Sequence, residues 1–352
     1  MIRVKVVGAG GYGGVGITEL LLRHPETEIV CLAAAAEVGK RMSDIYPHLA
    51  GYCDQTVISY DTPEGKAPAD VVFFSTPDGV GMQFAAAELK SGARVIDFSG
   101  DFRFNDPRDY SEYARRIGRE TEHTAPDLLK QTVYGLPELN PSRLNSSTRL
   151  VGNPGCFASS VLLGLAPALA NGLIEPTGII CDCKTGVSGA GKKPNAVFHY
   201  PARYDHMNAY KLAGHQHTVE IERELSKLRG GPVTVTFTAQ VVPVCRGILS
   251  SLYGRLAPGV TPSTVQEAYR EYYKKHPFIR LFDRSSVLGT AHVRGTNRCI
   301  LIVDVDERNG FLRVISNIDN LMKGQSGNAL QNMNILFGFP QTLGLDQPGQ
   351  YP

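Results

Sequence analysis

The sequence predicts an α/β protein with two domains, one doubly wound around a parallel sheet and one α+β domain around a mixed sheet. Three observations support this fold class. The chain has 352 residues, more than a usual single core contains. Its first hundred residues alternate strand-like and helix-like runs, as parallel doubly wound sheets do. Beyond residue 230, runs rich in β-branched residues cluster instead, which indicates a sheet-rich second domain.

Composition narrows the classes of partner. The chain is 42% hydrophobic and 20% charged, as ordinary globular proteins are. Lysine and arginine number 36 against 34 aspartates and glutamates, a net charge of +2 that does not predict a nucleic-acid or anionic-membrane partner. The N-terminal segment has no apolar stretch long enough for a signal peptide or a membrane span. We therefore expect a cytoplasmic protein that binds small molecules.

The cysteines predict reduced thiols rather than a disulfide framework. There are seven of them, an odd number in a long chain. Cys181 and Cys183 alternate inside an apolar strand-like run and lack a second pair at metal-ligand spacing. We therefore assign no metal.

A glycine-rich turn follows the first strand. The strand-like Val4–Val7 leads into this turn, and the helix-like Val15–Arg23 follows it. Glycines allow the backbone to turn tightly and to approach a pyrophosphate, while the helix N-terminus supplies N–H donors and positive dipole. Glycine turns also serve packing, but the strand before and the helix after favour a Rossmann-type dinucleotide site. The residues expected there are Gly8, Gly10, Gly11, Tyr12, Gly13 and Gly14.

Later strands continue the alternation. Strand-like runs cover Glu28–Ala33, Asp70–Phe74 and Ala93–Asp97. Ligands of such sheets lie beyond the carboxyl ends of the strands, so Gly8, Ser75 and Ser99 would share one edge.

The segment after the second strand bears on the nucleotide. No acidic residue closes that strand, where an NAD-specific site usually holds the ribose hydroxyls. Ala33 to Ala36 lie there, and Glu37, Lys40 and Arg41 follow. We expect NADP, with the alternative that both cations only solvate a loop.

Cys156 is the candidate nucleophile. It follows Asn153-Pro154-Gly155 and precedes the helix-like Phe157–Leu169. Unpaired N–H groups and the dipole at a helix start favour a thiolate over a thiol. The alternative is a small buried residue in a core helix, since unpaired cysteine is often buried.

Two further segments carry polar groups. The small-residue loop from Thr185 to Pro194 ends in cations, so Ser188, Gly189 and Lys192 could hold an anion, or the loop could be only a flexible connection. Another loop leads into a helix-like run that ends at Leu228.

Two histidines frame the start of that last run. The two could be an inert surface pair, but together with Cys156 they favour acid–base chemistry by either His215 or His217, and Glu220, three residues after His217, could orient it. Arg246 lies at a probable strand end, where it could clamp a carboxylate or be a surface cation.

The remaining elements complete the predicted domains. We expect a final helix at Asn328–Phe337 and loops around residues 105–126 and 343–352. The nucleotide domain is expected to comprise residues 1–155 plus 323–352, and the catalytic domain residues 156–322. Strands of the second domain are expected at Val233–Val242, Ile248–Arg255, Thr290–Val293, Cys299–Val305 and Phe311–Ser316.

Six motifs in collinear order resemble the N-acetyl-gamma-glutamyl-phosphate reductase family. They are the turn at residues 8–14, Asp97-Phe98-Ser99-Gly100-Asp101-Phe102-Arg103, Tyr134-Gly135-Leu136-Pro137-Glu138, Gly152-Asn153-Pro154-Gly155-Cys156, residues 186–191 and His215-Gln216-His217-Thr218. The related aspartate-semialdehyde dehydrogenases place a histidine just after the glycine that follows the Val-Pro-Val strand. Here Ile248 follows Gly247, and the His-x-His-Thr segment is present instead.

The resemblance implies a glyceraldehyde-3-phosphate dehydrogenase-like fold, a homodimer or homotetramer, and reduction of N-acetyl-glutamyl 5-phosphate by NADPH. It implies a thioester on Cys156, with His217 as acid–base group, Glu220 orienting it and His215 in reserve. Besides the turn, the expected cofactor residues are Lys40 and Arg41, from their place after the second strand, together with Ser75, Pro77, Ser188, Gly189 and Asn320. The implied substrate residues are Ser99, Arg103, Asn153, Lys192, His215 and Arg246.

One departure affects the nucleotide. The family commonly carries a Ser-Arg pair after the second strand, suited to the 2′-phosphate of NADP, and the corresponding residues here are Ala34 and Ala35. We expect NADP with a raised KM for NADPH, because Lys40 and Arg41 follow closely.

Two other functions fit the same residues. One is a reductase of aspartyl phosphate or of carrier-bound aminoadipyl phosphate, with the same fold and nucleophile. The other is a nucleotide-binding sensor without chemistry, against which the combination of Cys156, His217 and Glu220 argues.

Overall fold

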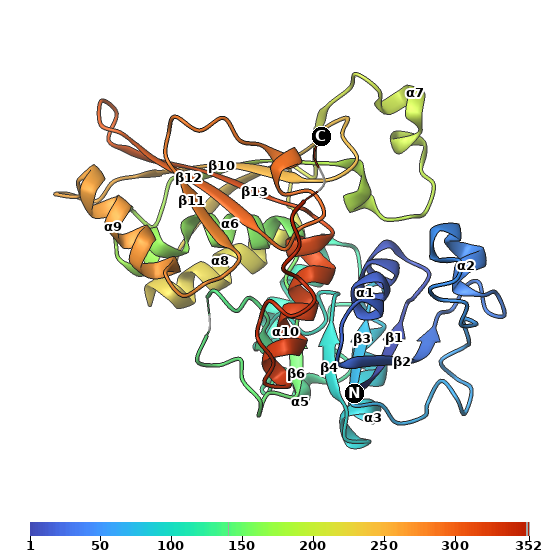
Figure 1. The fold of residues 1–352 in the computed structure, drawn as a ribbon. Coiled ribbons are helices and arrows are strands. Elements are labelled where there is room, and N and C mark those ends of the chain that lie inside the picture. The colour runs from blue at the N-terminus through green and yellow to red at the C-terminus, as the bar shows by residue number, and fades with distance from the viewer. Residues whose placement is uncertain (140, 350, 352) are drawn as a thin grey trace. The chain divides into compact units, whose positions relative to one another are not determined.

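The computed structural model describes residues 1–139, 141–349 and 351. They divide into two compact units (Figure 1). Unit 1 comprises residues 1–154 and 325–347, and unit 2 comprises residues 155–324 with the described part of 348–352.

Unit 1 contains a six-stranded sheet in which every pair of neighbours is parallel, in the order β2-β1-β3-β4-β6-β5. The strands are β1 (Ile2–Val7), β2 (Thr27–Ala33), β3 (Val71–Phe74), β4 (Arg94–Asp97), β5 (Val133–Tyr134) and β6 (Leu150–Gly152). Because the order reverses between β1 and β3, ligands are expected beyond the carboxyl ends of these two strands. The predicted doubly wound sheet is confirmed.

Helices connect these strands, and all four residues of β3 are buried. The C-terminal α10 belongs to unit 1 and contacts α1. The helices are α1 (Tyr12–Leu22), α2 (Met42–Ile45), α3 (Gly81–Lys90), α4 (Pro107–Arg116), α5 (Pro126–Leu129) and α10 (Gly327–Leu336).

α4 corrects the expectation of a loop around residues 105–126. The Asp106 side chain accepts a hydrogen bond from the Arg108 N–H, and Pro107 stands at the first helical position, where its missing N–H costs nothing. Tyr110 and Tyr113 are buried at helical spacing. The polar composition hid this amphipathic pattern.

Unit 2 contains a mixed seven-stranded sheet in the order β11-β12-β13-β10-β7-β9-β8. The β7/β9 and β11/β12 pairs are parallel and the other pairs antiparallel. The predicted mixed sheet is confirmed. Its strands are β7 (Ile179–Thr185), β8 (Asn208–Tyr210), β9 (Val235–Val241), β10 (Ile248–Arg255), β11 (Ile279–Phe282), β12 (Cys299–Asp306) and β13 (Phe311–Ile318).

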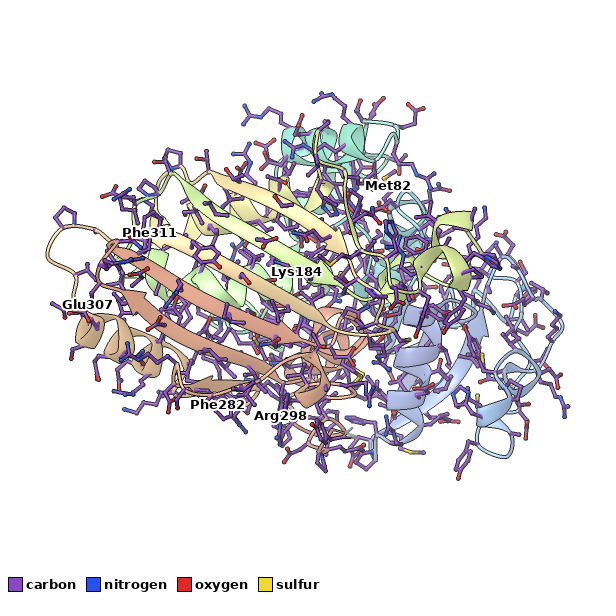
Figure 2. The ribbon with its side chains drawn as sticks, turned by 90° about the horizontal axis from the view of Figure 1, so that it is seen from above. Met82, Lys184, Phe282, Arg298, Glu307 and Phe311 are labelled. Atoms are coloured by element: carbon purple, nitrogen blue, oxygen red, sulfur yellow. The ribbon has the colours of Figure 1, made fainter. Side chains whose placement is uncertain are left out.

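Helices cover one face of this sheet. α6 (Cys156–Ala170), α8 (Gln216–Arg229) and α9 (Pro262–Tyr273) contact its strands, while the short α7 (Tyr200–Arg203) lies in the connection before β8. Residues on the other face alternate with buried ones and stay partly accessible. Figure 2 looks onto that face and shows Lys184 on it. We call it the open face; its partly or fully exposed apolar residues are Ile180, Leu249, Tyr253, Phe282, Ile302, Phe311 and Ile315.

One predicted strand of the second domain is wrong. Thr290–Val293 was expected to be extended, but Thr290–His292 form a 3-10 turn. The N–H groups of His292 and Val293 bond back to the carbonyls three residues earlier, so the segment satisfies its own backbone.

The described residues form neither a membrane-spanning helix nor a cluster of metal ligands. Among the helices that the structure describes, none combines the length and the apolar character needed to cross a membrane. Within residues 1–139, 141–349 and 351, no group of three or more His, Cys, Asp or Glu is placed to hold a metal ion.

Candidate active site

The glycine turn of unit 1 packs closely against the backbone that follows β3. Gly8 has φ +90°, and a Cβ there would lie 2.2 Å from the carbonyl oxygen of Ser75. Gly11 precedes α1 without a side-chain cap, so the first N–H groups of the helix have no side-chain acceptor at that position. This cradle of backbone donors fits the pyrophosphate of a dinucleotide.

The predicted cations after β2 differ in their surroundings. The Arg41 Nε and Nη2 donate to Asp44 at 3.1 and 2.8 Å, so this guanidinium is already paired with a carboxylate. Lys40 is exposed, and Pro77, after β3, is exposed as well.

Three predicted substrate residues make hydrogen bonds inside unit 1. The buried Arg103 donates to the carbonyl oxygens of Asn153 and Phe98 at 2.9 and 2.7 Å. The Asn153 side chain donates to Gln325 O and accepts from two asparagines of α10. The Ser99 hydroxyl donates to Asp97 Oδ1 at 2.5 Å. These contacts hold the segments that follow β4 and β6.

Asp97 ends β4 as a fully buried carboxyl group. Burial, and then the charge of Asp101, raise the pKa of Asp97 well above its usual range. Its Oδ2 has no hydrogen-bond partner among the described residues, and a Cβ on Gly81 would lie 2.0 Å from it. Asp97 is therefore held as a neutral acid more readily than an exposed aspartate.

Cys156 is the first residue of α6, at the predicted junction of turn and helix. Gly155 caps the helix with extended backbone, and its N–H donates to the Glu220 Oε1 at 2.8 Å. Glu220 is 1% exposed and lies in the second turn of α8. The carboxylate that was expected to orient His217 thus also fixes the residue before the thiol.

The two histidines sit at the start of α8. His215 is the N-cap residue, and its Nδ1 accepts the His217 N–H at 3.1 Å. Both rings are buried, with centroids 4.8 Å apart, and both contact the ring of Phe157, the neighbour of Cys156. The predicted nucleophile and both predicted histidines are therefore brought together.

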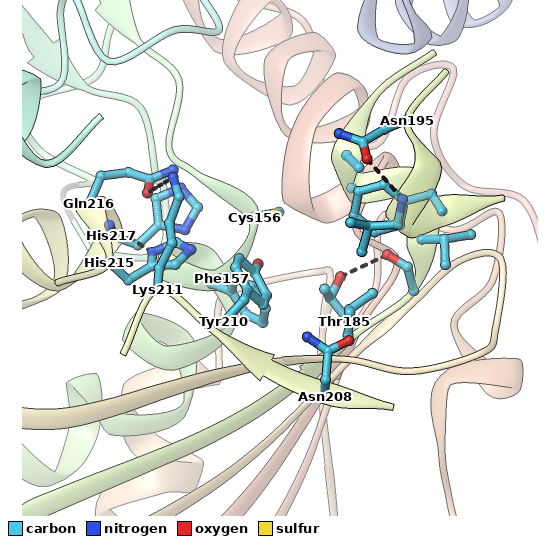
Figure 3. Close-up of a pocket in the computed structure, with 17 residues that line it drawn as sticks. Cys156, Phe157, Thr185, Asn195, Asn208, Tyr210, Lys211, His215, Gln216 and His217 are labelled. Carbon is cyan, nitrogen blue, oxygen red and sulfur yellow. Dashed lines mark hydrogen bonds between the residues drawn. The ribbon is translucent and has the colours of Figure 1, made fainter. Parts of the chain in front are cut away.

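These residues share a cavity of about 330 Å³ (Figure 3). Figure 3 shows Cys156 between the group of His215, Gln216, His217 and Lys211 and the opposite Asn195. Its lining residues are Cys156, Phe157, Thr185, Gly186, Val187, Gly189, Ala190, Asn195, Val197, Phe198, Asn208, Tyr210, Lys211, His215, Gln216, His217 and Val241.

Several of these lining residues were missed by sequence reasoning. Asn195, Asn208, Tyr210 and Lys211 belong to the segment between β7 and α8, which has no long periodic pattern. Burial, and then the charge of Cys156, raise the pKa of Tyr210, so its hydroxyl stays a proton donor near the thiol. The alternation along β8 was the available signal, because Asn208 and Tyr210 project to the same side.

Lys211 is the charged residue of the cavity. Among the described residues that line it, no other is a lysine or arginine, and none is an aspartate or glutamate. Lys211 has φ +50°, and its Nζ donates to Gln216 Oε1 at 2.9 Å. The cavity therefore suits an anionic ligand.

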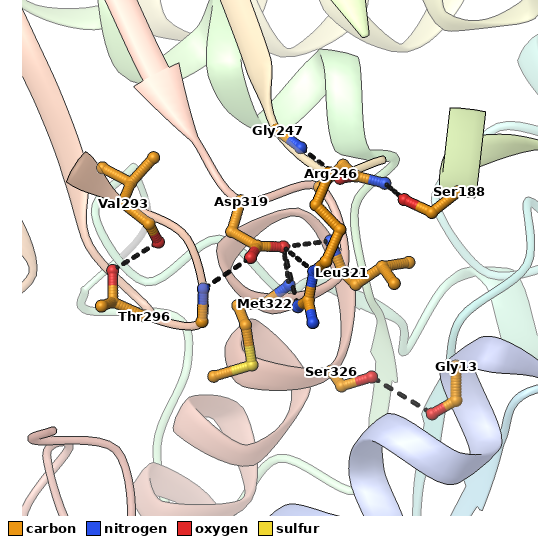
Figure 4. A network of polar contacts seen from close by, with 12 residues as sticks. Gly13, Ser188, Arg246, Gly247, Val293, Thr296, Asp319, Leu321, Met322 and Ser326 are labelled. Carbon is orange, nitrogen blue, oxygen red and sulfur yellow. Dashed lines mark hydrogen bonds and ion pairs between the residues drawn. The ribbon is translucent and has the colours of Figure 1, made fainter. Parts of the chain in front are cut away.

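Two residues predicted to bind anions, Arg246 and Lys192, lie outside the lining of this cavity. Arg246 donates from Nε and Nη2 to Asp319 Oδ1 at 3.2 and 3.0 Å, while Asp319 Oδ2 accepts the Gly295 N–H (Figure 4). Lys192 is exposed, and neither Lys192 nor Arg246 lines the cavity. Arg246, expected either to clamp a ligand carboxylate or to be a surface cation, is paired with the carboxylate of Asp319 in the same unit.

Ser188 and Asn320 were predicted together at the cofactor, and the structure brings them together. The Asn320 Nδ2 donates to Ser188 Oγ at 3.0 Å, and its Oδ1 accepts the Gly247 N–H at 2.7 Å (Figure 4). Gly189, next to Ser188, lines the cavity of Cys156.

Two family descriptions match the chain. Residues 3–147 match the NAD binding domain of semialdehyde dehydrogenases. Residues 156–320 match the semialdehyde dehydrogenase dimerisation domain.

Solved structures share this fold. Aspartate semialdehyde dehydrogenase II of Vibrio cholerae, complexed with ASA, aligns with a TM-score of 0.70 at 18% identity, over 96% of this chain and 98% of that one. Aspartate semialdehyde dehydrogenase of Candida albicans, with NADP, aligns with a TM-score of 0.65 at 18% identity, over the same shares.

Named relatives are much closer in sequence. The N-acetyl-gamma-glutamyl-phosphate reductase of Pelotomaculum thermopropionicum is 42% identical over 351 residues, which cover 100% of this chain and 99% of that protein. The protein of the same name from Symbiobacterium thermophilum is 44% identical over 353 residues, again covering 100% and 99%. This chain belongs to the N-acetyl-gamma-glutamyl-phosphate reductase family of semialdehyde dehydrogenases.

Proposed function

We propose that the chain reduces N-acetyl-glutamyl 5-phosphate to N-acetyl-glutamate 5-semialdehyde and phosphate with NADPH, a step of arginine biosynthesis. The observation that carries this function is the cavity in which Cys156, at the start of α6, faces two histidines and one lysine. A thiol at a helix start is suited to acyl transfer, and a cavity without carboxylates suits a substrate with a carboxylate and an acyl phosphate. Relatives named for this reaction support the choice.

The glycine turn leads into the start of α1, which has no side-chain cap, and this supports a nucleotide site there. We propose Gly8, Gly10, Gly11, Tyr12, Gly13 and Gly14 as its pyrophosphate site, with Lys40, Arg41, Ser75, Pro77, Ser188, Gly189 and Asn320 as further cofactor residues. When bound, NADPH supplies a hydride to an acyl carbon.

Cys156 performs the acyl transfer in this proposal. Its thiolate attacks the acyl carbon, the bond from that carbon to the phosphate oxygen breaks, and phosphate leaves with the electron pair. The resulting thioester is reduced at its carbon, the C–S bond then breaks, and aldehyde and thiolate are released. Backbone N–H groups at the start of α6 stabilise the oxygen that becomes negative.

His217 is the acid–base group in this proposal. Because the Nδ1 of His215 accepts a backbone N–H, the neutral His215 ring carries its proton on Nε2 and is a fixed donor. His217 is then the group that takes the thiol proton and passes it to the departing phosphate. Glu220 is proposed to position both His217 and Cys156. It lies three residues after His217, and it accepts the N–H of Gly155, the residue before Cys156.

Substrate contacts follow from the same cavity. We propose His215 as a donor to the substrate, and we add Lys211 as the cation for its carboxylate. Ser99, Arg103, Asn153, Lys192 and Arg246 remain proposed substrate residues, although the contacts described above already engage Ser99, Arg103, Asn153 and Arg246.

We further propose the domain division at residues 1–155 plus 323–352 and 156–322, which the two compact units support except after residue 347, where the chain is grouped with unit 2. Partly exposed apolar residues on the open face, in the region that matches the dimerisation domain, support a homodimer or homotetramer. All seven cysteines lie in the described residues as thiols rather than disulfides, which supports a cytoplasmic protein.

A substrate assay tests the function. N-acetyl-glutamate 5-semialdehyde with phosphate and NADP should yield NADPH, and Cys156→Ser should reduce turnover by roughly 10³-fold or more while dinucleotide binding persists. Cys245→Ser, at the exposed cysteine of the same unit, is the matched control and should keep its rate.

Each rival function has its own result. If turnover is seen only with aspartate semialdehyde or only with a carrier-bound substrate, the substrate proposed here is wrong and that compound takes its place. Dinucleotide binding without turnover, and without an acyl adduct on Cys156 by mass spectrometry, would favour the sensor.

A further inference from the structure

Glu37 places a carboxylate against the glycine turn of unit 1. It stands four residues after the end of β2, and its backbone has φ +66°, a left-handed conformation that is uncommon for residues other than glycine. A Cβ added to Gly10 would lie 2.5 Å from the Glu37 Oε2. The left-handed backbone thus turns this side chain toward the middle of the nucleotide cradle.

Tyr46 completes a polar group at this turn. Its hydroxyl donates to the Gly10 carbonyl oxygen at 2.9 Å. Burial, and then the charge of Glu37, raise the pKa of Tyr46 to about 12, so the phenol stays protonated.

The residues on either side of Glu37 in the sequence determine which nucleotide this end of β2 suits. Residues 34–36 are alanines, and Arg41 is bonded twice to Asp44, with which it starts α2. Lys40 is exposed. The segment after β2 therefore places the carboxylate of Glu37 beside Gly10, in the turn where a dinucleotide would bind.

The adenosine ribose of a dinucleotide lies above this turn, beyond the end of the second strand of such sheets. A carboxylate there accepts hydrogen bonds from the 2′ and 3′ hydroxyls of NADH, whereas it repels the 2′-phosphate of NADPH. We propose that Glu37 binds the adenosine ribose and lets this chain accept NADH. The difference between its affinities for NADPH and NADH is thereby reduced. This assignment rests on the proposed function only in requiring a nicotinamide dinucleotide.

Direct binding, without turnover, tests the role of Glu37. The Kd values of NADH and NADPH are measured by nucleotide fluorescence on the wild-type chain and should lie within about tenfold of each other. Glu37→Gln should tighten NADPH and weaken NADH, each by about tenfold, because it removes the charge and keeps the shape. Glu64→Gln removes an exposed carboxylate of the same unit and should change neither Kd.

A second variant guards against loss of folding. Glu37→Gly suits the left-handed backbone, so it should raise the melting temperature and shift both affinities in the same directions as Glu37→Gln. Tight binding of NADPH with no response of either Kd to these variants would overturn the role of Glu37 alone. Binding of neither dinucleotide to the wild-type chain would overturn the proposed function together with it.

Discussion

Lys211 shows how one side chain sets the charge of a site. It is held in a left-handed backbone conformation and bonded to Gln216 at the edge of the cavity around Cys156. Backbone strain of this kind costs of order 1–3 kcal/mol and tends to occur at functional positions. In the proposed function, Lys211 binds the carboxylate of the amino-acid end of the substrate.

Lys211→Met tests this contact. A charge-assisted hydrogen bond contributes about 1.5–3 kcal/mol, so KM for N-acetyl-glutamate 5-semialdehyde should rise about tenfold or more while kcat changes little. Steady-state kinetics should be repeated with 4-acetamidobutanal, which lacks only the carboxylate, and there the variant should match the wild type.

A matched lysine separates this effect from general charge loss. Lys193→Met removes an exposed lysine of the same unit, outside the cavity lining, and should leave KM unchanged. Equal losses of the Lys211 variant on both aldehydes would contradict a contact with the carboxylate.

Residues at element starts could be predicted from sequence, while residues in irregular segments could not. Cys156, His215 and His217 lie where a turn signal meets a helical pattern, and they share one cavity. Lys211 lies in a connection without periodicity. For Arg246 the sequence leaves open a carboxylate clamp or a surface cation, because it does not show the distant partner Asp319 to which Arg246 donates.

At the scale of elements, α8 depends on its first histidine. The His215 ring takes the place of a serine or aspartate cap by accepting the His217 N–H. His215→Ala should therefore lower the free energy of unfolding by about 0.5–2 kcal/mol, and His215→Asn, a good capping residue, should restore most of it. Urea denaturation measures both, with the exposed His206→Ala as control. Identical losses in the alanine and asparagine variants would argue against capping.

The end of β4 should make stability depend on pH through Asp97. Its folded pKa is raised, so the folded chain keeps this proton to higher pH than the unfolded chain. The stability linked to this proton is present below the ordinary pKa of aspartate, about 3.9, and is lost as pH rises through the folded value.

Asp97→Asn removes that titration. The free energy of unfolding of the variant, relative to the wild type, should be larger at pH 8 than at pH 5, as measured by denaturant titration at each pH. The exposed Asp127→Asn should show no such change. A difference between Asp97→Asn and wild type that is constant with pH would reject the raised pKa.

Element prediction worked where periodicity was long and failed where capping decided the outcome. β10 has the predicted bounds, Ile248–Arg255, because alternation runs through all eight residues. The helix α4 was not predicted, because the signals for its start are the N-cap Asp106 and Pro107 rather than a pattern of apolar residues. The strand expected at Thr290–Val293 was too short for alternation to distinguish it from a turn.

At the scale of the whole molecule, the open face of unit 2 is the proposed subunit contact. Apolar side chains on adjacent strands, such as Ile302 and Ile315, are paired in register and partly exposed. Contiguous apolar surface of this kind commonly marks an interface.

Ile315→Asp should therefore convert the oligomer to monomer, because a carboxylate would have to be desolvated in the contact. Size-exclusion chromatography with light scattering measures the mass. Val287→Asp places the same charge at an apolar residue of unit 2 that is 94% exposed, and it should leave the mass unchanged. A monomeric wild type would disprove the contact.

The distribution of groups between the two units has a kinetic consequence. Cys156, His217, Glu220 and Lys211 all belong to unit 2, whereas the glycine cradle belongs to unit 1. The groups assigned to the acyl transfer itself, Cys156, His217 and Glu220, therefore belong to one unit, in which the Gly155 N–H donates to Glu220. Exchange of labelled phosphate into the acyl donor should then proceed before any reductant is added, and the acyl-enzyme would accumulate in advance of the hydride.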